Sequence, residues 1–286
     1  MILQNIVGDG IAKLVYQRTS IPPLPPDYCY NNKMKITILS ENQMSPSKSG
    51  YKTCSAEWGL SLFIELDNTK ILFDTGHSEI YKNNARQLGV DLNSADFAVL
   101  SHHHWDHAKG LPNHEFTNKK KLILHPEVLN KVPSEDAELF RKDFEIVGSD
   151  KPIEFSTEVI FLGEIPRTNN FEKGAFQNDD MKDDSALAIK TPKGLVVVAG
   201  CSHAGIVNIC EYAKQVTGQS IYAVIGGLHL FDDDKPAVNG AINFLKKENP
   251  EHVYPLHCID PPTFSRFYNE LGATKYGVGD VITIKI

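Results

Sequence analysis

The chain has 286 residues, 41% of them hydrophobic and 23% charged, which is the balance of a compact globular protein and excludes collagen, coiled-coil and low-complexity classes. Its formal net charge is −7 and it has no long block of lysine or arginine, so nucleic acid is not an expected partner. No apolar run approaches the ~20 residues that a membrane-spanning helix needs, so no membrane association is expected.

The first 33 residues differ in character from the rest of the chain. They contain a polyproline-like sequence at residues 21–26, which cannot lie inside a helix or a central strand. We therefore expect residues 1–33 to form an N-terminal extension and residues 34–286 to form one domain.

From residue 34 onward, strand-like and helix-like segments alternate. The hydrophobic pattern predicts strands over residues 35–41, 59–66, 70–76, 96–101, 121–125, 158–164, 185–191, 194–200, 222–227, 252–258 and 281–286. It predicts helices over residues 80–90, 134–144, 204–216 and 237–247. The pairs 59–66 with 70–76 and 185–191 with 194–200 are separated by short turns and predict hairpins. Together these elements predict a mixed α/β domain whose sheet is covered by helices on its outer faces.

The cysteine content indicates a reducing compartment. Five cysteines are an odd number, and none forms a pair with zinc-finger spacing, which argues against a disulfide scaffold and predicts a cytoplasmic protein. The N-terminus also lacks the pattern of a secretory signal. Four of the five are interpreted as ordinary thiols: Cys29, Cys54, Cys210 and Cys258.

A cluster of histidines directly after the strand at 96–101 carries the strongest chemical signal. Alternate residues at a strand end project to the same side, so His102 and His104 can converge on one point. A short helical turn would let Asp106 and His107 face a second point nearby. Imidazole and carboxylate ligands suit zinc, iron or manganese, which favours a metal site over a solvated polar loop.

The spacing His-x-His-x-Asp-His at residues 102–107, preceded by Phe-Asp-Thr-Gly at 73–76, resembles the signature of the metallo-β-lactamase superfamily. The segments 57–61, 200–205, 226–230 and 256–258 are similar to the subfamily related to 7,8-dihydropterin-6-methyl-4-(β-D-ribofuranosyl)-aminobenzene-5'-phosphate synthase. The resemblance covers residues 34–286. It implies an α/β (α+β) fold, a four-layer αββα sandwich of the metallo-β-lactamase type, with one or two metal ions bound between the sheets.

Carried over to this chain, the resemblance implies that His102 and His104 bind a first ion. It implies that Asp106, His107 and His257 bind a second. Asp74 matches an aspartate that orients a ligand histidine, although an aspartate opening the turn before Gly76 is an equal alternative.

The middle of the pattern departs from the common form of the superfamily. Most members have a Gly-His turn that supplies a third ligand to the first ion, and a Gly-Asp whose carboxylate bridges both ions. This chain has Gly-Cys-Ser-His at residues 200–203 instead. We expect His203 to be the missing ligand, with a substrate-facing or core role as its alternative. Cys201, as a bridging thiolate, and Asp184 are alternative ligands.

These features predict a metal-dependent hydrolase with one or two zinc ions per chain, or with iron or manganese in their place. Bound ions would lower the pKa of water from about 15.7 toward about 7, and the hydroxide would attack a small-molecule ester or a phosphorylated or pterin-like substrate. Asp106 would orient the nucleophile or accept its proton. His229, at a strand end, would contact substrate or assist proton transfer, unless it is structural.

Two other functions remain open at this point. One is a di-iron redox protein of the same fold, although such proteins normally carry more carboxylate ligands and a flavin domain. The other is a protein that binds a metal or ligand without catalysis. A small-molecule substrate is the expected partner, and oligomer formation is left open.

Overall fold

The structure, a computed structural model, describes residues 33–45 and 54–286. The expected N-terminal extension, residues 1–33, lies outside the described residues except for Lys33, and Cys29 lies outside them as well.

The first sheet has seven strands in the described part of the chain, in the order β13-β1-β2-β3-β4-β5-β6. Their bounds are β13 (Val281–Lys285), β1 (Lys33–Ser40), β2 (Ser61–Glu65), β3 (Lys70–Phe73), β4 (Phe97–Val99), β5 (Lys120–Leu124) and β6 (Phe144–Gly148). The pairs from β13 to β3 are antiparallel, and those from β3 to β6 are parallel. The β2–β3 pair confirms the first predicted hairpin.

The second sheet has six strands among the described residues, in the order β12-β11-β10-β9-β8-β7. Their bounds are β12 (His252–Leu256), β11 (Ile221–Gly227), β10 (Gly194–Ala199), β9 (Ala186–Thr191), β8 (Val159–Phe161) and β7 (Ile153–Ser156). The strands β10, β11 and β12 run parallel, whereas the pairs from β7 to β10 are antiparallel. The β9–β10 pair confirms the second predicted hairpin.

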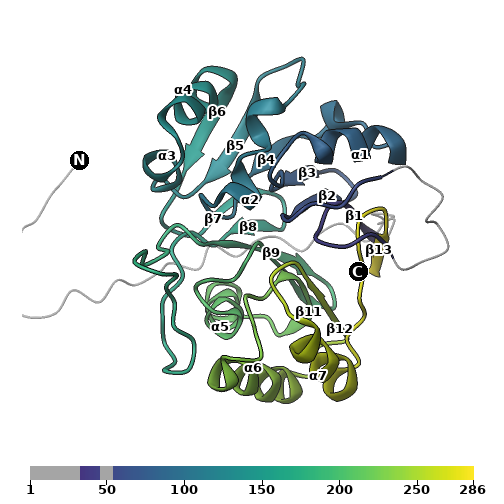
Figure 1. The fold of residues 1–286 in the computed structure, drawn as a ribbon, viewed down its shortest axis with the longest axis vertical. Coiled ribbons are helices and arrows are strands. Elements are labelled where there is room, and N and C mark those ends of the chain that lie inside the picture. Colours follow the sequence, from purple (N-terminus) through teal and green to yellow (C-terminus); the bar gives the residue numbers. More distant parts are fainter. Residues whose placement is uncertain (1–32, 46–53) are drawn as a thin grey trace, which may run out of the picture. The chain divides into compact units, whose positions relative to one another are not determined.

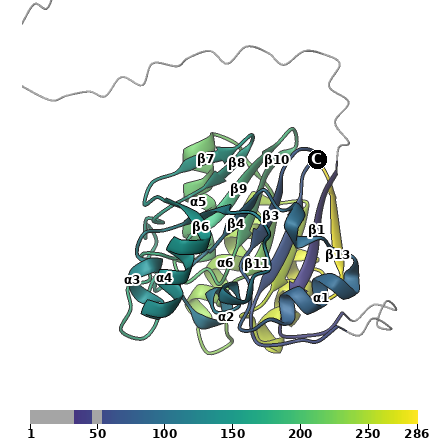
Figure 2. The same cartoon turned by 90° about the horizontal axis from the view of Figure 1, so that it is seen from above.

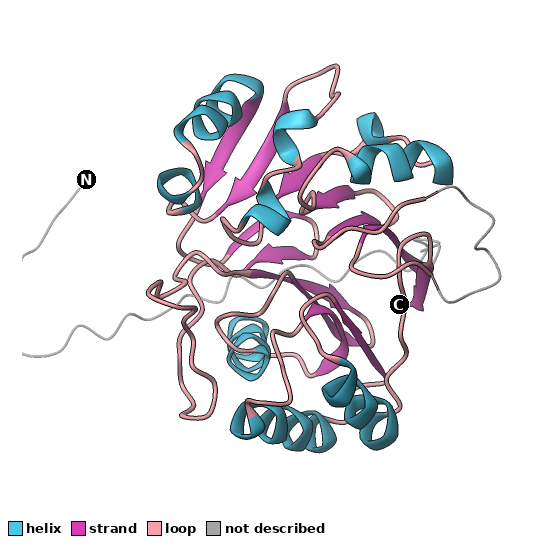
Figure 3. Ribbon diagram, viewed as in Figure 1, coloured by secondary structure: helices cyan, strands magenta, loops and turns pink. Residues whose placement is uncertain are grey.

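Helices cover the outer face of each sheet (Figures 1 and 3). On the first sheet lie α1 (Ile80–Leu88), α2 (Trp105–Ala108), α3 (Val128–Lys131) and α4 (Ser134–Asp143). On the second lie α5 (Ile206–Thr217), α6 (Lys235–Glu248) and α7 (Pro261–Leu271). Figure 2 looks down on the α1 to α4 layer, with strands of the first sheet beneath it. This arrangement confirms the predicted αββα sandwich. Among the described residues, no helix combines the length and apolar composition that crossing a bilayer requires.

The alternation of side chains along β10 explains the layering. Val196 and Val198 pack in the core between the two sheets, while Leu195 and Val197 pack on the opposite face against α5 and α6. Successive side chains of a strand point to opposite faces, so a strand covered on both sides must be apolar at every position. This is why β10 reads as an unbroken apolar run.

The connection between β8 and β9 is tied to the second helical layer through Glu172. Its buried carboxylate accepts hydrogen bonds from the backbone N–H groups of Val207 (2.8 Å) and Asn208 (3.0 Å) in the first turn of α5. These groups have no partner within the helix. Gly205 permits the contact, because a Cβ there would lie 2.2 Å from the Glu172 carboxylate. Glu172 therefore fixes both the long connection and the start of α5.

We expect the variant Glu172→Ala to lose about 1–2 kcal/mol of unfolding free energy, because it leaves two backbone N–H groups of α5 without their carboxylate. Chemical denaturation followed by circular dichroism measures the loss. Glu138→Ala, at an exposed position of α4, is the matched control and should change the stability little. Equal stability of the two variants would contradict this role of Glu172.

Candidate metal centre

The histidine cluster is anchored to the first sheet by Asp74. Asp74 follows β3, and Ser101 follows β4, the parallel neighbour of β3. The backbone N–H of Ser101 donates to Oδ1 of Asp74 (2.8 Å), and the Ser101 hydroxyl donates to Oδ2 (2.7 Å). The chain then passes through His102 and His104 into α2, a short helical turn of the kind that would let Asp106 and His107 face a second point. This helix carries Asp106 and His107.

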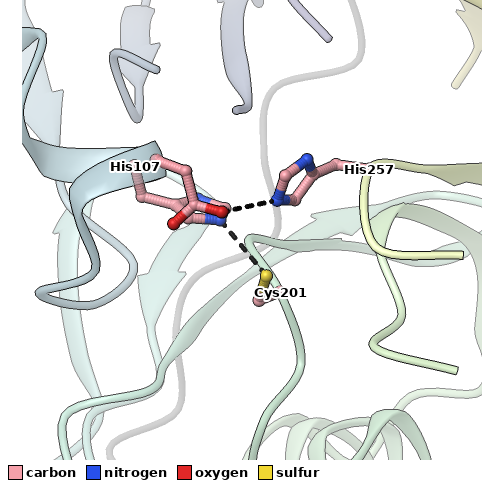
Figure 4. A group of neighbouring side chains, drawn as sticks. His107, Cys201 and His257 are labelled. Atoms are coloured by element: carbon pink, nitrogen blue, oxygen red, sulfur yellow. Dashed lines mark hydrogen bonds and ion pairs between the residues drawn. The ribbon is translucent and has the colours of Figure 1, made fainter. Parts of the chain in front are cut away.

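A first group of four buried side chains brings both sheets together. The ligand atoms of Asp106, His107, Cys201 and His257 all lie within 4.8 Å of one another. Nε2 of His107 lies 3.2 Å from Sγ of Cys201, and Nε2 of His257 lies 3.1 Å from Oδ2 of Asp106. Figure 4 shows the side chains of His107, Cys201 and His257 pointing toward one another. They come from α2 and from the ends of β10 and β12.

A second group shares Cys201 with the first. The ligand atoms of His102, Cys201 and His203 lie within 4.8 Å of one another, and all three residues are buried. The ring of His104 lies 4.8 Å from the ring of His102 and 4.7 Å from that of His203, measured between centroids. His104 thus flanks this group, although its nitrogens belong to none of the compact groups in the described part of the chain.

The structure corrects the interpretation of Cys258 as an ordinary thiol. Sγ of Cys258 lies 2.6 Å from Sγ of Cys201, and both thiols are buried. Cys201, Cys258 and His229 form a third compact group. In the sequence, Cys258 directly follows His257 at the end of a predicted strand. This position is the sequence feature that could have indicated a role of Cys258 at the site.

The chemistry of these side chains fits a divalent metal ion. Nε2 of His102, both ring nitrogens of His203 and Nδ1 of His229 are buried without a hydrogen-bond partner, which is unusual for polar atoms in a protein interior. Burial and the neighbouring rings of His107 and His203 hold the pKa of His102 well below its usual range. Neutral imidazoles whose buried nitrogens lie close to other ligand atoms and have no hydrogen-bond partner are suited to bind zinc or a similar ion.

Hydrogen bonds to the other ring nitrogens fix the orientation of three histidines. Nδ1 of His107 lies 2.8 Å from Oδ2 of Asp74, Nδ1 of His257 lies 2.7 Å from Oδ1 of Asn42, and Nδ1 of His102 lies 2.9 Å from the hydroxyl of Ser101. Each contact leaves Nε2 to face the compact groups, as in known metal sites.

Asp184 lies beside His102 and belongs to none of the compact groups among the described residues. Its Oδ1 is 3.9 Å from Nδ1 of His102, and its Oδ2 accepts the backbone N–H of Ala204. Burial raises the pKa of Asp184 to about 7. Asp184 thus supports the loop after β10 through Oδ2, while its Oδ1 is buried without a hydrogen-bond partner, as are the ring nitrogens of His203.

His103 and Trp105, which are interleaved with the histidines, belong to none of the compact groups in the described part of the chain. Nδ1 and the backbone N–H of His103 both lie 2.8 Å from Oδ2 of Asp183, which also binds Lys131 through Oδ1. Trp105 is 50% exposed.

A cavity of about 480 Å³ opens onto the groups, and its lining includes Cys201, His203, His229 and Cys258. Four aromatic side chains, Trp58, Trp105, Phe176 and Phe231, also line it. Nε1 of Trp58 donates to Oδ2 of Asp106 at 3.1 Å. The roles of Asn42, Phe176 and Phe231 had no recognisable signal in the sequence, since they depend on contacts between distant segments.

His229 lies at the cavity wall with its backbone in the left-handed region, at φ 46°. Its ring centroid is 4.2 Å from that of His203 and 5.3 Å from that of Phe176. Burial, and secondarily the charge of His257, lowers the pKa of His229 to about 4.

Comparison with known proteins agrees with this architecture. The sequence model of the family described as the metallo-beta-lactamase superfamily matches residues 59–200. The chain is 32% identical over 277 residues to 7,8-dihydropterin-6-methyl-4-(beta-D-ribofuranosyl)-aminobenzene-5'-phosphate synthase of Methanocaldococcus jannaschii. The alignment covers 84% of this chain and 92% of that protein.

Solved structures share the fold over most of the chain. Tm1679, a metal-dependent hydrolase of the beta-lactamase superfamily, superposes with a TM-score of 0.73 at 24% identity, covering 88% of this chain and all of that one. Zn(2+)-bound PqqB from Methylobacterium extorquens superposes with a TM-score of 0.57 at 13% identity, covering 87% and 99%. With the histidine-aspartate motif at the end of β4 and the αββα sandwich around it, the chain belongs to the metallo-β-lactamase superfamily.

Proposed function

We propose that the protein is a hydrolase that binds two zinc ions in the groups around Cys201. The observation that carries the proposal is the sharing of one buried thiol by two groups of metal-ligating side chains at the base of a cavity. The proposed ligands of the first ion are His102, His104 and His203. Those of the second are Asp106, His107 and His257, with Cys201 between both ions.

The ligand types support zinc over iron. Asp106 is the one carboxylate in the compact groups of the described residues, and the other members are imidazoles and thiols. A thiolate is a softer ligand than the bridging carboxylate common in the superfamily, and soft ligands select zinc. This composition disfavours the di-iron redox alternative, in which carboxylates predominate.

The protein groups around the cavity have distinct proposed roles. Divalent ions held by these residues would lower the pKa of water from about 15.7 toward about 7 and would so supply hydroxide near neutral pH. Asp106, held by Trp58 and His257, orients the nucleophile or accepts its proton. His229 is uncharged near neutral pH, so it donates a hydrogen bond to the leaving group and not a proton.

The cavity supports a small substrate with a flat ring. Its volume of about 480 Å³ is typical of small-molecule sites, and the rings of Trp58, Phe176 and Phe231 offer stacking surfaces. Lys173 is the one lysine or arginine that lines it among the described residues, and it is paired with Asp234 at 2.8 Å. The Methanocaldococcus relative is named as the synthase of a phosphorylated dihydropterin compound, which supports a phosphorylated or pterin-like ligand in this cavity.

We expect purified protein to hold about two zinc ions per chain and the variant His203→Ala to lose at least one of them, because His203 supplies buried nitrogens without any other partner. Elemental analysis by plasma mass spectrometry counts and identifies the ions. His252→Ala is the control, since His252 lies at the opposite end of the strand that precedes His257. Retention of both ions in His203→Ala would rule out the ligand assignment.

Turnover tests the hydrolase itself. The zinc-loaded protein should hydrolyse at least one class among phosphomonoesters, phosphodiesters and lactones, and Asp106→Asn should lower kcat/KM by about 10²-fold or more. Asp233→Asn, the same change at the exposed rim of the cavity, should retain activity. A fully metal-loaded protein that turns over none of these substrates would instead favour the non-catalytic binding protein.

A further inference from the structure

Two thiols at the metal centre meet across an intervening strand. Cys201 follows β10 and Cys258 follows β12, and β11 lies between these strands. Neighbouring strands are about 4.8 Å apart, so residues two strands apart are separated by roughly 10 Å. The two sulfur atoms nevertheless lie 2.6 Å from each other. The contact therefore requires both loops to bend over the end of β11.

The sequence at the end of β11 permits this approach. A Cβ on Gly227 would lie 2.2 Å from the carbonyl oxygen of Gly200 and 3.2 Å from Cα of Cys201. A larger residue would hold the loop after β10 away from its neighbours. The backbone N–H of Leu230 donates to the carbonyl of Cys258 at 3.1 Å, which fixes the loop after β12 from the other side.

The backbone of Cys258 is itself in an unfavourable conformation. Its φ of 58° lies in the left-handed region, which is sterically unfavourable for an L-residue. Such conformations persist where the surroundings demand them and cluster at functional sites. Here the turn directs the thiol toward Cys201, whereas an ordinary core thiol would need no such backbone.

Both thiols also line the cavity, so a small oxidant can reach them. Cys210 provides the contrast, because it is equally buried but lies on α5 within the core between that helix and the second sheet. The pair therefore combines proximity with access, which Cys210 lacks.

We propose that Cys201 and Cys258 form a reversible disulfide that withdraws Cys201 from the metal centre. A peroxide is the oxidant: one thiol breaks the O–O bond and becomes a sulfenic acid with release of water, and the other thiol displaces a second water to form the S–S bond. Two thiols and one hydrogen peroxide thus give one disulfide and two waters. A dithiol reverses the reaction by exchange.

The effect on metal rests on the proposed function, whereas the thiol chemistry does not. Cys201 belongs to both groups proposed to bind ions, and a disulfide sulfur lacks the thiolate charge that makes cysteine a strong ligand. Oxidation would therefore weaken both groups at once.

The test treats the metal-loaded protein with increasing hydrogen peroxide. Peptide mapping by mass spectrometry reads the disulfide, and a chromogenic chelator reads the released metal. We expect a Cys201–Cys258 linkage together with release of at least one ion per chain, both reversed by dithiothreitol and added zinc. Cys258→Ala should hold its ions at the peroxide dose that releases them from the parent, and the control Cys210→Ala should behave as the parent does.

Three results would overturn the proposal. The first is oxidation of other thiols by peroxide in the parent protein without formation of the Cys201–Cys258 disulfide. This result is read from the parent protein alone and needs no variant. The second is equal metal release from Cys258→Ala and the parent. The third is loss of metal from folded Cys258→Ala before oxidation, which would make Cys258 a ligand. Purified protein without bound metal would instead refute the proposed function. Peptide mapping would still show whether peroxide links Cys201 to Cys258.

Discussion

The carboxylate of Asp74 is the interaction on which the arrangement of the site depends. It accepts hydrogen bonds from the backbone and hydroxyl of Ser101 and contacts Nδ1 of His107, so one buried group holds both ends of the histidine cluster. Gly200 packs against this anchor, since a Cβ there would lie 2.1 Å from the Ser101 hydroxyl and 3.0 Å from Oδ2 of Asp74. The absence of a side chain at Gly200 lets the next residue, Cys201, approach the histidines.

The site is built jointly by the two sheets. The first sheet supplies the histidine cluster after β4, and the second supplies Cys201, His203 and His257 from the ends of parallel strands. Cys201 lies at the centre of this arrangement and belongs to all three compact groups. Because a thiol takes the place where most superfamily members have a carboxylate, the zinc preference and the oxidation sensitivity that we propose both rest on the same atom.

Much of the fold follows from local patterns in the sequence. Both hairpins and the four longer predicted helices are present, because their apolar periodicity extends over whole elements. The strands β6 and β7 were not predicted, since each lies at the edge of its sheet and is only partly buried. Helix α7 was also missed: it begins with two prolines, which favour the first turn of a helix although they disrupt its interior.

The site was most readily predicted where its residues are close in sequence or match a family motif. The cluster at residues 102–107 carries its own spacing. The structure brings close to it His257, which the family resemblance implied, and His203, which we expected in place of the missing ligand. The contacts of Cys258 with Cys201 and of Asn42 with His257 span 57 and 215 residues. Such contacts depend on strand order and on glycines such as Gly227, which sequence patterns alone do not place in space.

The most direct test of the central claim is a crystal structure of the zinc-loaded protein with anomalous scattering measured on both sides of the zinc absorption edge. The account predicts two zinc peaks per chain, one among His102, His104 and His203 and one among Asp106, His107 and His257, with Sγ of Cys201 contacting both. Zinc bound elsewhere on a well-ordered chain, or a Cys201 sulfur that contacts neither ion, would contradict it.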